Sequence, residues 1–191
     1  MRVILASASQ RRVELLRIFN FEFEAIPSDI PENQRISESP TQIVMGLALE
    51  KALSISKVHP ESLVIASDTI VYLDQVLGKP SHRQEAKEML TKLSGEKHEV
   101  YTGVALIHEP SNRRIVDFVK TTVFFNTLTE KEIDVYLDTG EADDKAGAYG
   151  IQGYGALLVH HIEGDYYNVM GLPLSKLNAM LKKHFDMDLL F

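Results

Sequence analysis

The chain has 191 residues, of which 45% are hydrophobic and 25% charged, and its formal net charge is −7. This composition excludes a disordered or low-complexity chain, and the length suits a single domain, which we predict to span residues 1–191. Because the chain contains no cysteine, disulfides and thiolate metal sites are excluded too. The acidic balance argues against a nucleic acid polymer as partner, since binding one requires many cations along its phosphate backbone.

Membrane spans and signal peptides form the next class to exclude. No stretch reaches the roughly 18 apolar residues of a membrane span, and the apolar run over residues 3–6 is too short for the core of a signal peptide. The sequence therefore predicts a cytoplasmic protein with no membrane partner. A small anionic ligand is compatible with the net charge, because a few local cations are enough to bind it.

The first half of the chain alternates short apolar runs with helical patterns. Residues 3–6 are typical of a buried strand, and a polar loop and a helix ending at Asn20 follow. Ser39 then signals a second helix, with a proline at the first helical position and an amide three residues after the cap, reaching about Lys57. Further strand patterns, the last of them a hairpin, cover residues 21–25, 63–66 and 70–77.

The second half of the chain contains longer strand patterns. Residues 100–107 and 115–125 are β-rich runs joined by a polar turn, which favours antiparallel pairing beside the shorter strands. Helices opened by Ser81 and by a capping box at Thr129 are expected as well. A glycine-rich stretch, a strand and a last helix follow over residues 147–155, 156–162 and 173–184. This order of elements predicts an α/β fold with a mixed sheet flanked by helices.

The segment from Ser7 to Arg12 stands where a strand passes into a helix. Helix N–H groups, two serine hydroxyls and the guanidiniums of Arg11 and Arg12 can converge there on an anion, for which phosphate is the natural candidate. A capping serine followed by solvated arginines explains the same residues equally well. From this segment alone, both interpretations stay open.

Asp68 is the best placed carboxylate of the sequence. It follows an apolar run, so we expect it at the end of a strand, where α/β proteins often carry their active sites. There it could act as a general base toward water or bind a divalent metal, and a turn or helix cap is the alternative. Sequence spacing does not decide which other loop carboxylate would share a metal with Asp68; the candidates are Glu32, Asp143 and Asp144.

Two lysines and a glycine-rich loop complete the candidate residues. Lys51 lies on an otherwise apolar helical stripe, where snorkelling to the surface is the alternative, and Lys79 stands in a turn. In the loop, small residues allow a ligand to approach the backbone, and Gln152 offers a donor and an acceptor suited to a base edge. The histidines show no metal-ligand spacing, so the sequence does not support a zinc site.

Several short motifs follow one another in a fixed order along nearly the whole chain. They include Ser-Ala-Ser-Gln-Arg-Arg, Ser-Asp-Thr and Gly-Lys-Pro, and they cover residues 7–12, 67–69, 78–80, 93–95, 144–153, 164–167 and 169–173. In this order they resemble the Maf family of nucleoside triphosphate pyrophosphatases. The chain departs from the family pattern at Gln10, where proline is usual, and at Ala66-Ser67, where Gly-Ala is common.

The resemblance implies an elongated α/β fold of the Maf/ITPase-like type, with a mixed twisted sheet, a central cleft and an ability to form a homodimer. It also implies hydrolysis of a nucleoside triphosphate to its monophosphate and pyrophosphate, with a divalent cation such as Mg²⁺ or Mn²⁺. Asp68 would be the general base and would bind the metal together with Glu32. The residues that match the phosphate path are Ser7, Arg12, Lys51 and Lys79.

Within the family, this sequence looks like the branch that prefers dTTP and UTP at Arg11, Thr69 and Gln152. The resemblance therefore predicts a pyrimidine nucleotide as substrate. Two alternatives stay open. One is the same chemistry on 7-methyl-GTP or another modified purine, and the other is a nucleotide-binding regulator of septum formation that needs no turnover.

Overall fold

The computed structural model describes residues 1–28, 30 and 38–191, and the strands among them form one mixed sheet. Parallel and antiparallel pairs both occur, because β1 is parallel to β2 and β3, whereas β4 is antiparallel to β3 and β7 to β6. The mixed α/β fold predicted from the sequence is confirmed. The strand order is β2 (Glu24–Ala25), β1 (Val3–Leu5), β3 (Leu63–Leu73), β5 (Lys97–His108), β6 (Arg113–Phe125) and β7 (Val159–Glu163), with β4 (Gln75–Leu77) paired to β3 off this path.

Residue contacts divide the chain into two compact units. The first comprises Met1–Asp68, Thr102–Val119 and Gly171–Phe191, and the second comprises Thr69–Tyr101 and Lys120–Met170. The strands β3, β5 and β6 each contribute residues to both units. In neither unit does a helix of the described residues have the length and apolar character needed to cross a membrane.

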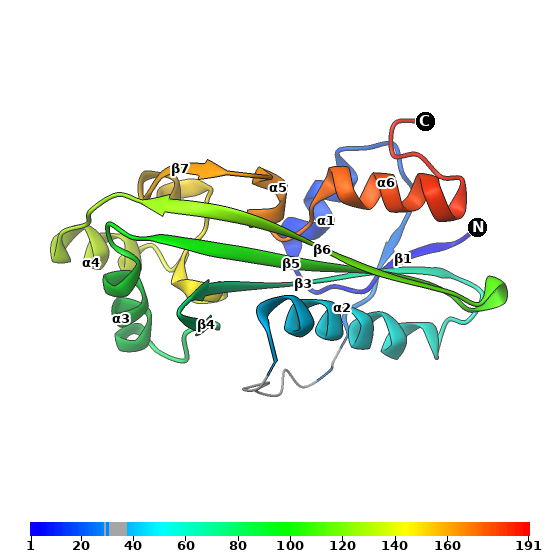
Figure 1. Cartoon of the computed structure of the whole chain (residues 1–191), viewed down its shortest axis with the longest axis horizontal. Coiled ribbons are helices and arrows are strands. Elements are labelled where there is room, and N and C mark those ends of the chain that lie inside the picture. Colours follow the sequence, from blue (N-terminus) through cyan, green and yellow to red (C-terminus); the bar gives the residue numbers. More distant parts are fainter. Residues whose placement is uncertain (29, 31–37) are drawn as a thin grey trace. The chain divides into compact units, whose positions relative to one another are not determined.

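Helices cover both faces of the sheet in the first unit (Figure 1). On one face lies α2 (Pro40–Ser56), and on the other lie α1 (Gln10–Arg17) and α6 (Leu174–Phe185). Because side chains alternate between the two faces of a strand, one set of alternate residues packs against α2. The buried cluster formed in this way contains Ile4, Ala6, Ala48, Ala52, Ile55, Val64, Ala66, Ala105 and Ile107.

The helix α2 lies unusually close to β5. A Cβ atom added to Gly103 would stand 2.2 Å from the carbonyl oxygen of Val44, so the strand needs glycine at this point. The helix begins at the predicted capping box, in which Ser39 and Gln42 exchange hydrogen bonds between side chain and backbone. Cap and close packing together fix the helix that carries Lys51.

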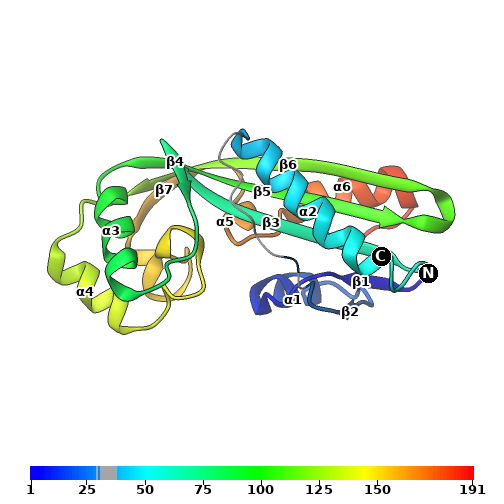
Figure 2. The ribbon, with the colours of Figure 1, turned by 90° about the horizontal axis from the view of Figure 1, so that it is seen from below.

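In the second unit, α3 (Arg83–Leu93) and α4 (Glu130–Asp138) pack side by side (Figure 2), and the 3₁₀ segment η2 (Ala146–Ala148) packs against α3. A second 3₁₀ segment, η3 (Gly153–Leu157), leads into β7, and α5 (Tyr166–Val169) follows that strand. The buried core of this unit includes Val71, Leu90, Leu93, Val100, Val123, Phe125, Ile133, Leu137, Tyr149 and Leu158.

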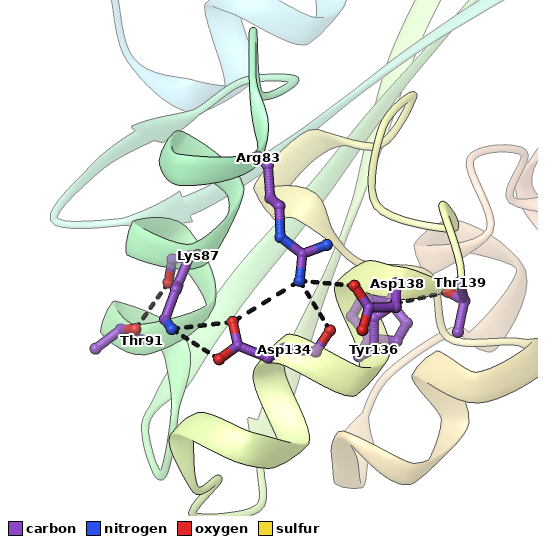
Figure 3. Close-up of polar contacts among 7 residues, drawn as sticks. All are labelled: Arg83, Lys87, Thr91, Asp134, Tyr136, Asp138 and Thr139. Carbon is purple, nitrogen blue, oxygen red and sulfur yellow. Dashed lines mark hydrogen bonds and ion pairs between the residues drawn. The ribbon is translucent and has the colours of Figure 1, made fainter.

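Ion pairs join α3 to α4 (Figure 3). Lys87 Nζ donates to both carboxylate oxygens of Asp134 at 2.9 Å. Arg83 Nη2 donates to the main-chain carbonyl of Asp134 at 3.1 Å and lies 2.8 Å from Asp138 Oδ1. Pairs as exposed as these add little stability, but their number restricts how the two helices can slide past each other.

Asp68 does not lie at a strand end, contrary to the prediction. It lies inside β3, because this strand continues to Leu73 against other partners after its parallel neighbour β1 has stopped at Leu5. The predicted hairpin after it is confirmed, and the turn is a single residue, Asp74, with a φ of 56°. β1 thus ends opposite Ile65, three residues before Asp68.

Other boundaries differ by a few residues. The cap of α3 is His82 instead of Ser81, since His82 Nδ1 accepts from the Glu85 N–H at 3.1 Å. The strand expected over residues 156–162 begins only at Val159, because the glycine-rich approach to it forms η3. The strand expected over residues 21–25 is confined to its last two residues.

Candidate active site

A buried ion pair joins Asp68 to Lys51 in the first unit. Asp68 Oδ1 accepts from Lys51 Nζ, and the side chains of Asp68 and Lys51 are only 6% and 11% exposed. Asp68 lies on the same face of β3 as Val64 and Ala66, against which α2 packs. Lys51, on the otherwise apolar stripe of α2, thus binds a carboxylate inside the protein, and its side chain does not snorkel to the surface.

The carbonyl of Gly171 brings Arg12 and Ser67 together. It accepts from Arg12 Nε at 2.8 Å and from Ser67 Oγ at 3.0 Å. Gly171 has a φ of 100°, a conformation that costs glycine little, and it stands just before α6. The bond through Nε therefore holds the guanidinium of Arg12 next to the residue that precedes Asp68.

Ser7 lies at the junction of β1 and α1. It is 6% exposed, and its hydroxyl accepts from the Ser9 N–H at 3.1 Å. Although Ser9 is the N-cap of α1 by position, its side chain makes no capping hydrogen bond. The structure therefore does not have the capping serine that was the alternative explanation of this segment, and the start of α1 keeps the donor character of a helix N-terminus.

Arg12 and Lys51 approach β3 from two sides. Ser67 and Asp68 are consecutive strand residues, so their side chains point to opposite faces of the sheet. The arginine meets the Ser67 side through Gly171, whereas the lysine meets Asp68 from α2. The arrangement in the first unit thus combines one carboxylate with two cations around a two-residue stretch of β3.

Four further binding residues were predicted, and one of them, Thr69, directly follows Asp68 in the chain. Arg11 is half-buried in the first turn of α1. Thr69, Lys79 and Gln152 belong to the second unit, where Thr69 is half-buried in β3 and Lys79 is exposed after β4. Gln152 is exposed directly before η3.

Only some of the predicted metal ligands fall on described residues, since Glu32 lies outside them. Where the structure describes the chain, no three side chains of His, Asp or Glu form a group that could hold a metal. Asp144 pairs with Lys145 at 2.7 Å. Asp68 nevertheless fits a Mg²⁺ or Mn²⁺ ion shared with a substrate, because such ions often use one or two carboxylates together with phosphate oxygens.

Sequence reasoning missed Ser67 and Gly171 as parts of this site. Ser67 is completely buried in an otherwise apolar run, and a buried hydroxyl needs a hydrogen-bond partner, so this position carried a usable signal. Gly171 lies in a motif that was noticed, but spacing could not show that its carbonyl meets Arg12, 159 positions away.

A family model, named relatives and a solved structure all match this chain over nearly its whole length. The model of a family described as Maf-like protein matches residues 2–184. A dTTP/UTP pyrophosphatase of Clostridioides difficile (strain 630) is 48% identical, over 100% of this chain and 99% of that protein. Another from Bacillus cytotoxicus is 52% identical, over 97% of this chain and 96% of that protein.

Similarity to a solved structure supports the fold. A HAM1 protein from Coxiella burnetii superposes with a TM-score of 0.54 at 14% identity, over 96% of this chain and 99% of that chain. At so low an identity the similarity concerns the arrangement of the backbone alone. It agrees with the mixed sheet and flanking helices described above.

Proposed function

The chain belongs to the Maf-like protein family, and from this premise we propose that it hydrolyses dTTP and UTP to the monophosphate and pyrophosphate. Support comes from the two dTTP/UTP pyrophosphatases that match it at about half identity over nearly their full lengths. The structural observation that carries the proposal is the buried pair of Asp68 and Lys51 next to the anchored Arg12. This group unites a proton acceptor with two cations suited to phosphate oxygens.

Asp68 is the proposed general base. It takes a proton from a water molecule whose oxygen bonds to the α-phosphorus, while the bond from that phosphorus to the bridging oxygen breaks and pyrophosphate leaves. Opposite charge on Lys51 offsets part of the cost of burying the carboxylate. The pair therefore keeps a base available inside the protein.

Arg12, Lys51 and Ser7 are the proposed phosphate-binding residues of the first unit. The bond from Arg12 Nε to Gly171 restricts the guanidinium before any ligand arrives, so less conformational freedom is lost on binding. Ser7 stands at the start of α1, where helix N–H groups favour an anion. Lys79 is the proposed phosphate-binding residue of the second unit, as the family resemblance implies.

A divalent cation, Mg²⁺ or Mn²⁺, is part of the proposal, held by Asp68 and, as the resemblance implies, by Glu32. When bound, such an ion neutralises negative charge on the phosphates during hydrolysis. Chelation with EDTA is therefore expected to abolish pyrophosphate release from dTTP, and added Mg²⁺ or Mn²⁺ to restore it. Turnover that survives exhaustive chelation would contradict the metal requirement.

The pyrimidine preference is assigned to Arg11, Thr69 and Gln152. Product identification by chromatography tests it, with purified protein, Mg²⁺ or Mn²⁺, and separate incubations with dTTP, UTP, CTP, ATP, GTP and 7-methyl-GTP. We expect monophosphate and pyrophosphate from dTTP and UTP. Diphosphate and orthophosphate would contradict the cleavage position, and turnover of 7-methyl-GTP alone would contradict the pyrimidine assignment.

Asp68→Asn separates an enzyme from a nucleotide-binding regulator. Loss of a general base lowers turnover by about 10²- to 10⁴-fold, so kcat for dTTP should fall into this range while calorimetry still detects triphosphate binding. The exposed Asp186→Asn is the matched control and should keep its activity. If wild-type protein binds dTTP without turning it over under any metal condition, the regulator is the better description.

A cytoplasmic location and a homodimer complete the proposal. The family resemblance supports the homodimer. Sedimentation equilibrium is expected to give twice the chain mass of 21.5 kDa. A monomer at micromolar concentration would contradict the dimer, and recovery of the protein outside the cytoplasmic fraction of its native cells would contradict the location.

A further inference from the structure

The segment over residues 145–155 is held to the rest of the second unit by hydrogen bonds to its main chain. The Gly147 N–H donates to the Gly78 carbonyl at 3.0 Å, and the Gly150 N–H donates to the Tyr136 hydroxyl at 3.1 Å. At its far end, the carboxylate of Glu141 accepts from two N–H groups, those of Tyr154 at 3.1 Å and Gly155 at 3.2 Å. Gln152 lies between these fixed points.

One anchor of the segment reaches into the core. The Tyr149 hydroxyl and His98 Nε2 are hydrogen-bonded at 2.7 Å, and the two residues are 5% and 2% exposed, respectively. The three rings of His98, Tyr149 and Phe125 pack edge to face. The centroid distances are 5.0 Å between His98 and Phe125, 5.3 Å between His98 and Tyr149, and 4.7 Å between Phe125 and Tyr149. Aromatic rings thus enclose this hydrogen bond, so water competes with it very little.

The segment also adopts backbone conformations that need outside support. Ala148, completely buried, has a φ of 60°, a region that residues with a Cβ adopt rarely and at a cost. A Cβ added to Gly155 would stand 1.9 Å from the carbonyl oxygen of Gly150, so the segment folds tightly back on itself. Such a conformation persists only where surrounding contacts determine it, and Tyr149 is adjacent to the strained residue.

The helix that presents Tyr136 is itself braced. Tyr136 belongs to α4, and the ion pairs of Arg83 and Lys87 tie α4 to α3 (Figure 3). The η2 segment, which contains Ala148, packs against the same α3. Helices α3 and α4 thus form a base on which the segment rests, and His98 supplies the contact from the sheet.

His98 has no evident part in the proposed chemistry. It lies in the second unit, and among the described residues nothing pairs with its Nδ1 atom. Burial lowers the pKa of His98 to about 4, so the ring is neutral at pH 7. A polar ring in an apolar core costs more than a hydrophobic one of equal size, which points to a directional role for its single hydrogen bond.

We propose that His98 is the positioning residue that, through the Tyr149 hydroxyl, fixes the backbone of residues 145–155 and so the placement of Gln152 toward a pyrimidine base. This inference rests on the proposed contact of Gln152 with substrate. The hydrogen bond sets the rotation of Tyr149, Tyr149 sets the strained turn at Ala148, and the turn sets the direction in which the chain continues to Gln152. His98 itself touches neither base nor phosphate in this arrangement.

The test compares four variants with wild type. His98→Phe keeps the aromatic packing and removes the hydrogen bond. His98→Phe combined with Tyr149→Phe removes both polar partners, which restores stability because no buried polar group is left unpaired. His98→Gln keeps a polar atom near the position of Nε2 and is the conservative variant. Val123→Ala shortens a side chain of the same core and leaves every anchor of the segment in place.

Steady-state kinetics with UTP and CTP provide the first readout. For His98→Phe we expect KM for UTP to rise about tenfold and the preference for UTP over CTP to shrink, because small displacements of a substrate-positioning group have effects of this size. The double variant should recover its melting temperature but keep the raised KM, whereas His98→Gln should lie close to wild type. A KM that recovers together with stability would overturn the positioning role.

Hydrogen exchange at the amides of Gly150 and Gly155 provides a second readout that needs no substrate. Exchange at both should accelerate about tenfold or more in His98→Phe and in the double variant, and it should be unchanged in Val123→Ala. Unchanged protection in the His98 variants would overturn the inference. If wild type hydrolyses neither dTTP nor UTP, or if Gln152→Ala leaves the preference for UTP intact, the proposed function fails, and the exchange data still decide whether His98 holds the segment.

Discussion

Asp68 carries a charge in a position where only a few per cent of its side chain meets solvent. Burying such a charge costs several kcal/mol. An opposite charge offsets this cost only when it is close and held in a fixed position. Lys51 satisfies that condition because it extends from a helix packed on the same face of the strand. The stability of this region therefore depends on the pair as a unit more than on either residue.

Lys51→Met tests this dependence. The variant leaves a buried carboxylate without its cation, so the free energy of unfolding should fall by about 3 kcal/mol in urea titrations. Lys120→Met, which breaks the much more exposed pair with Glu99, serves as control and should lose clearly less. Replacing both buried partners, as Lys51→Met with Asp68→Leu, should recover most of the loss; a double variant as unstable as Lys51→Met would contradict this account.

At the scale of elements, the position of α2 depends on the absence of one side chain. Gly103 lets the helix backbone approach β5 at Val44, seven residues before Lys51 along the chain. A methyl group there would have to displace main-chain atoms, since a carbonyl oxygen cannot rotate away as a flexible side chain can. The displacement would pass along the helix to Lys51.

Gly103→Ala should therefore lower the free energy of unfolding by about 3 kcal/mol and reduce turnover of dTTP as well. The matched control is Gly78→Ala, where an added Cβ meets nothing within 4 Å and where we expect a change within about 0.5 kcal/mol. Urea denaturation midpoints and initial rates measure both effects. Equal midpoints for the two variants would show that α2 tolerates the shift.

Elements with a local signal were predictable, and elements defined by distant partners were not. Capping residues predicted the starts of α2 and α4, because a cap acts within three residues of itself. The end of a strand has no such signal at Asp68, since pairing with another strand decides how far β3 continues. For the same reason Arg12 could be recognised as a candidate site residue, whereas its meeting with Ser67 at the Gly171 carbonyl could not be predicted.

At the scale of the whole molecule, folding is coupled to the protonation of His98. Burial lowers its pKa from 6.5 to about 4. Between pH 6.5 and pH 4, His98 is therefore mostly protonated in the unfolded chain and mostly neutral in the folded protein. The free energy of unfolding should therefore fall as pH drops from 6.5 to 4, by about 3 kcal/mol in total from this residue, and this contribution should stay constant below pH 4.

Urea denaturation at half-unit intervals between pH 7 and pH 4 measures this coupling. Protonation of carboxylates also lowers the free energy of unfolding near pH 4, so wild type is compared with His98→Gln. The variant should lack the decrease in free energy of unfolding that His98 causes between pH 6.5 and 4. If the wild-type and His98→Gln curves are parallel, His98 does not resist protonation in the folded protein.

The bond between Arg12 and Gly171 has a consequence for how the protein is made. A ribosome releases the chain from its N-terminus, so Arg12 emerges 159 residues before the carbonyl that holds it. A chain that ends prematurely between Asp68 and Gly171 already contains Lys51 and Asp68, yet it lacks the anchor that Arg12 and Ser67 share. Synthesis thus delivers Lys51 and Asp68 early and the anchor of Arg12 last, so products truncated between Asp68 and Gly171 contain Arg12 without the carbonyl that restricts its guanidinium.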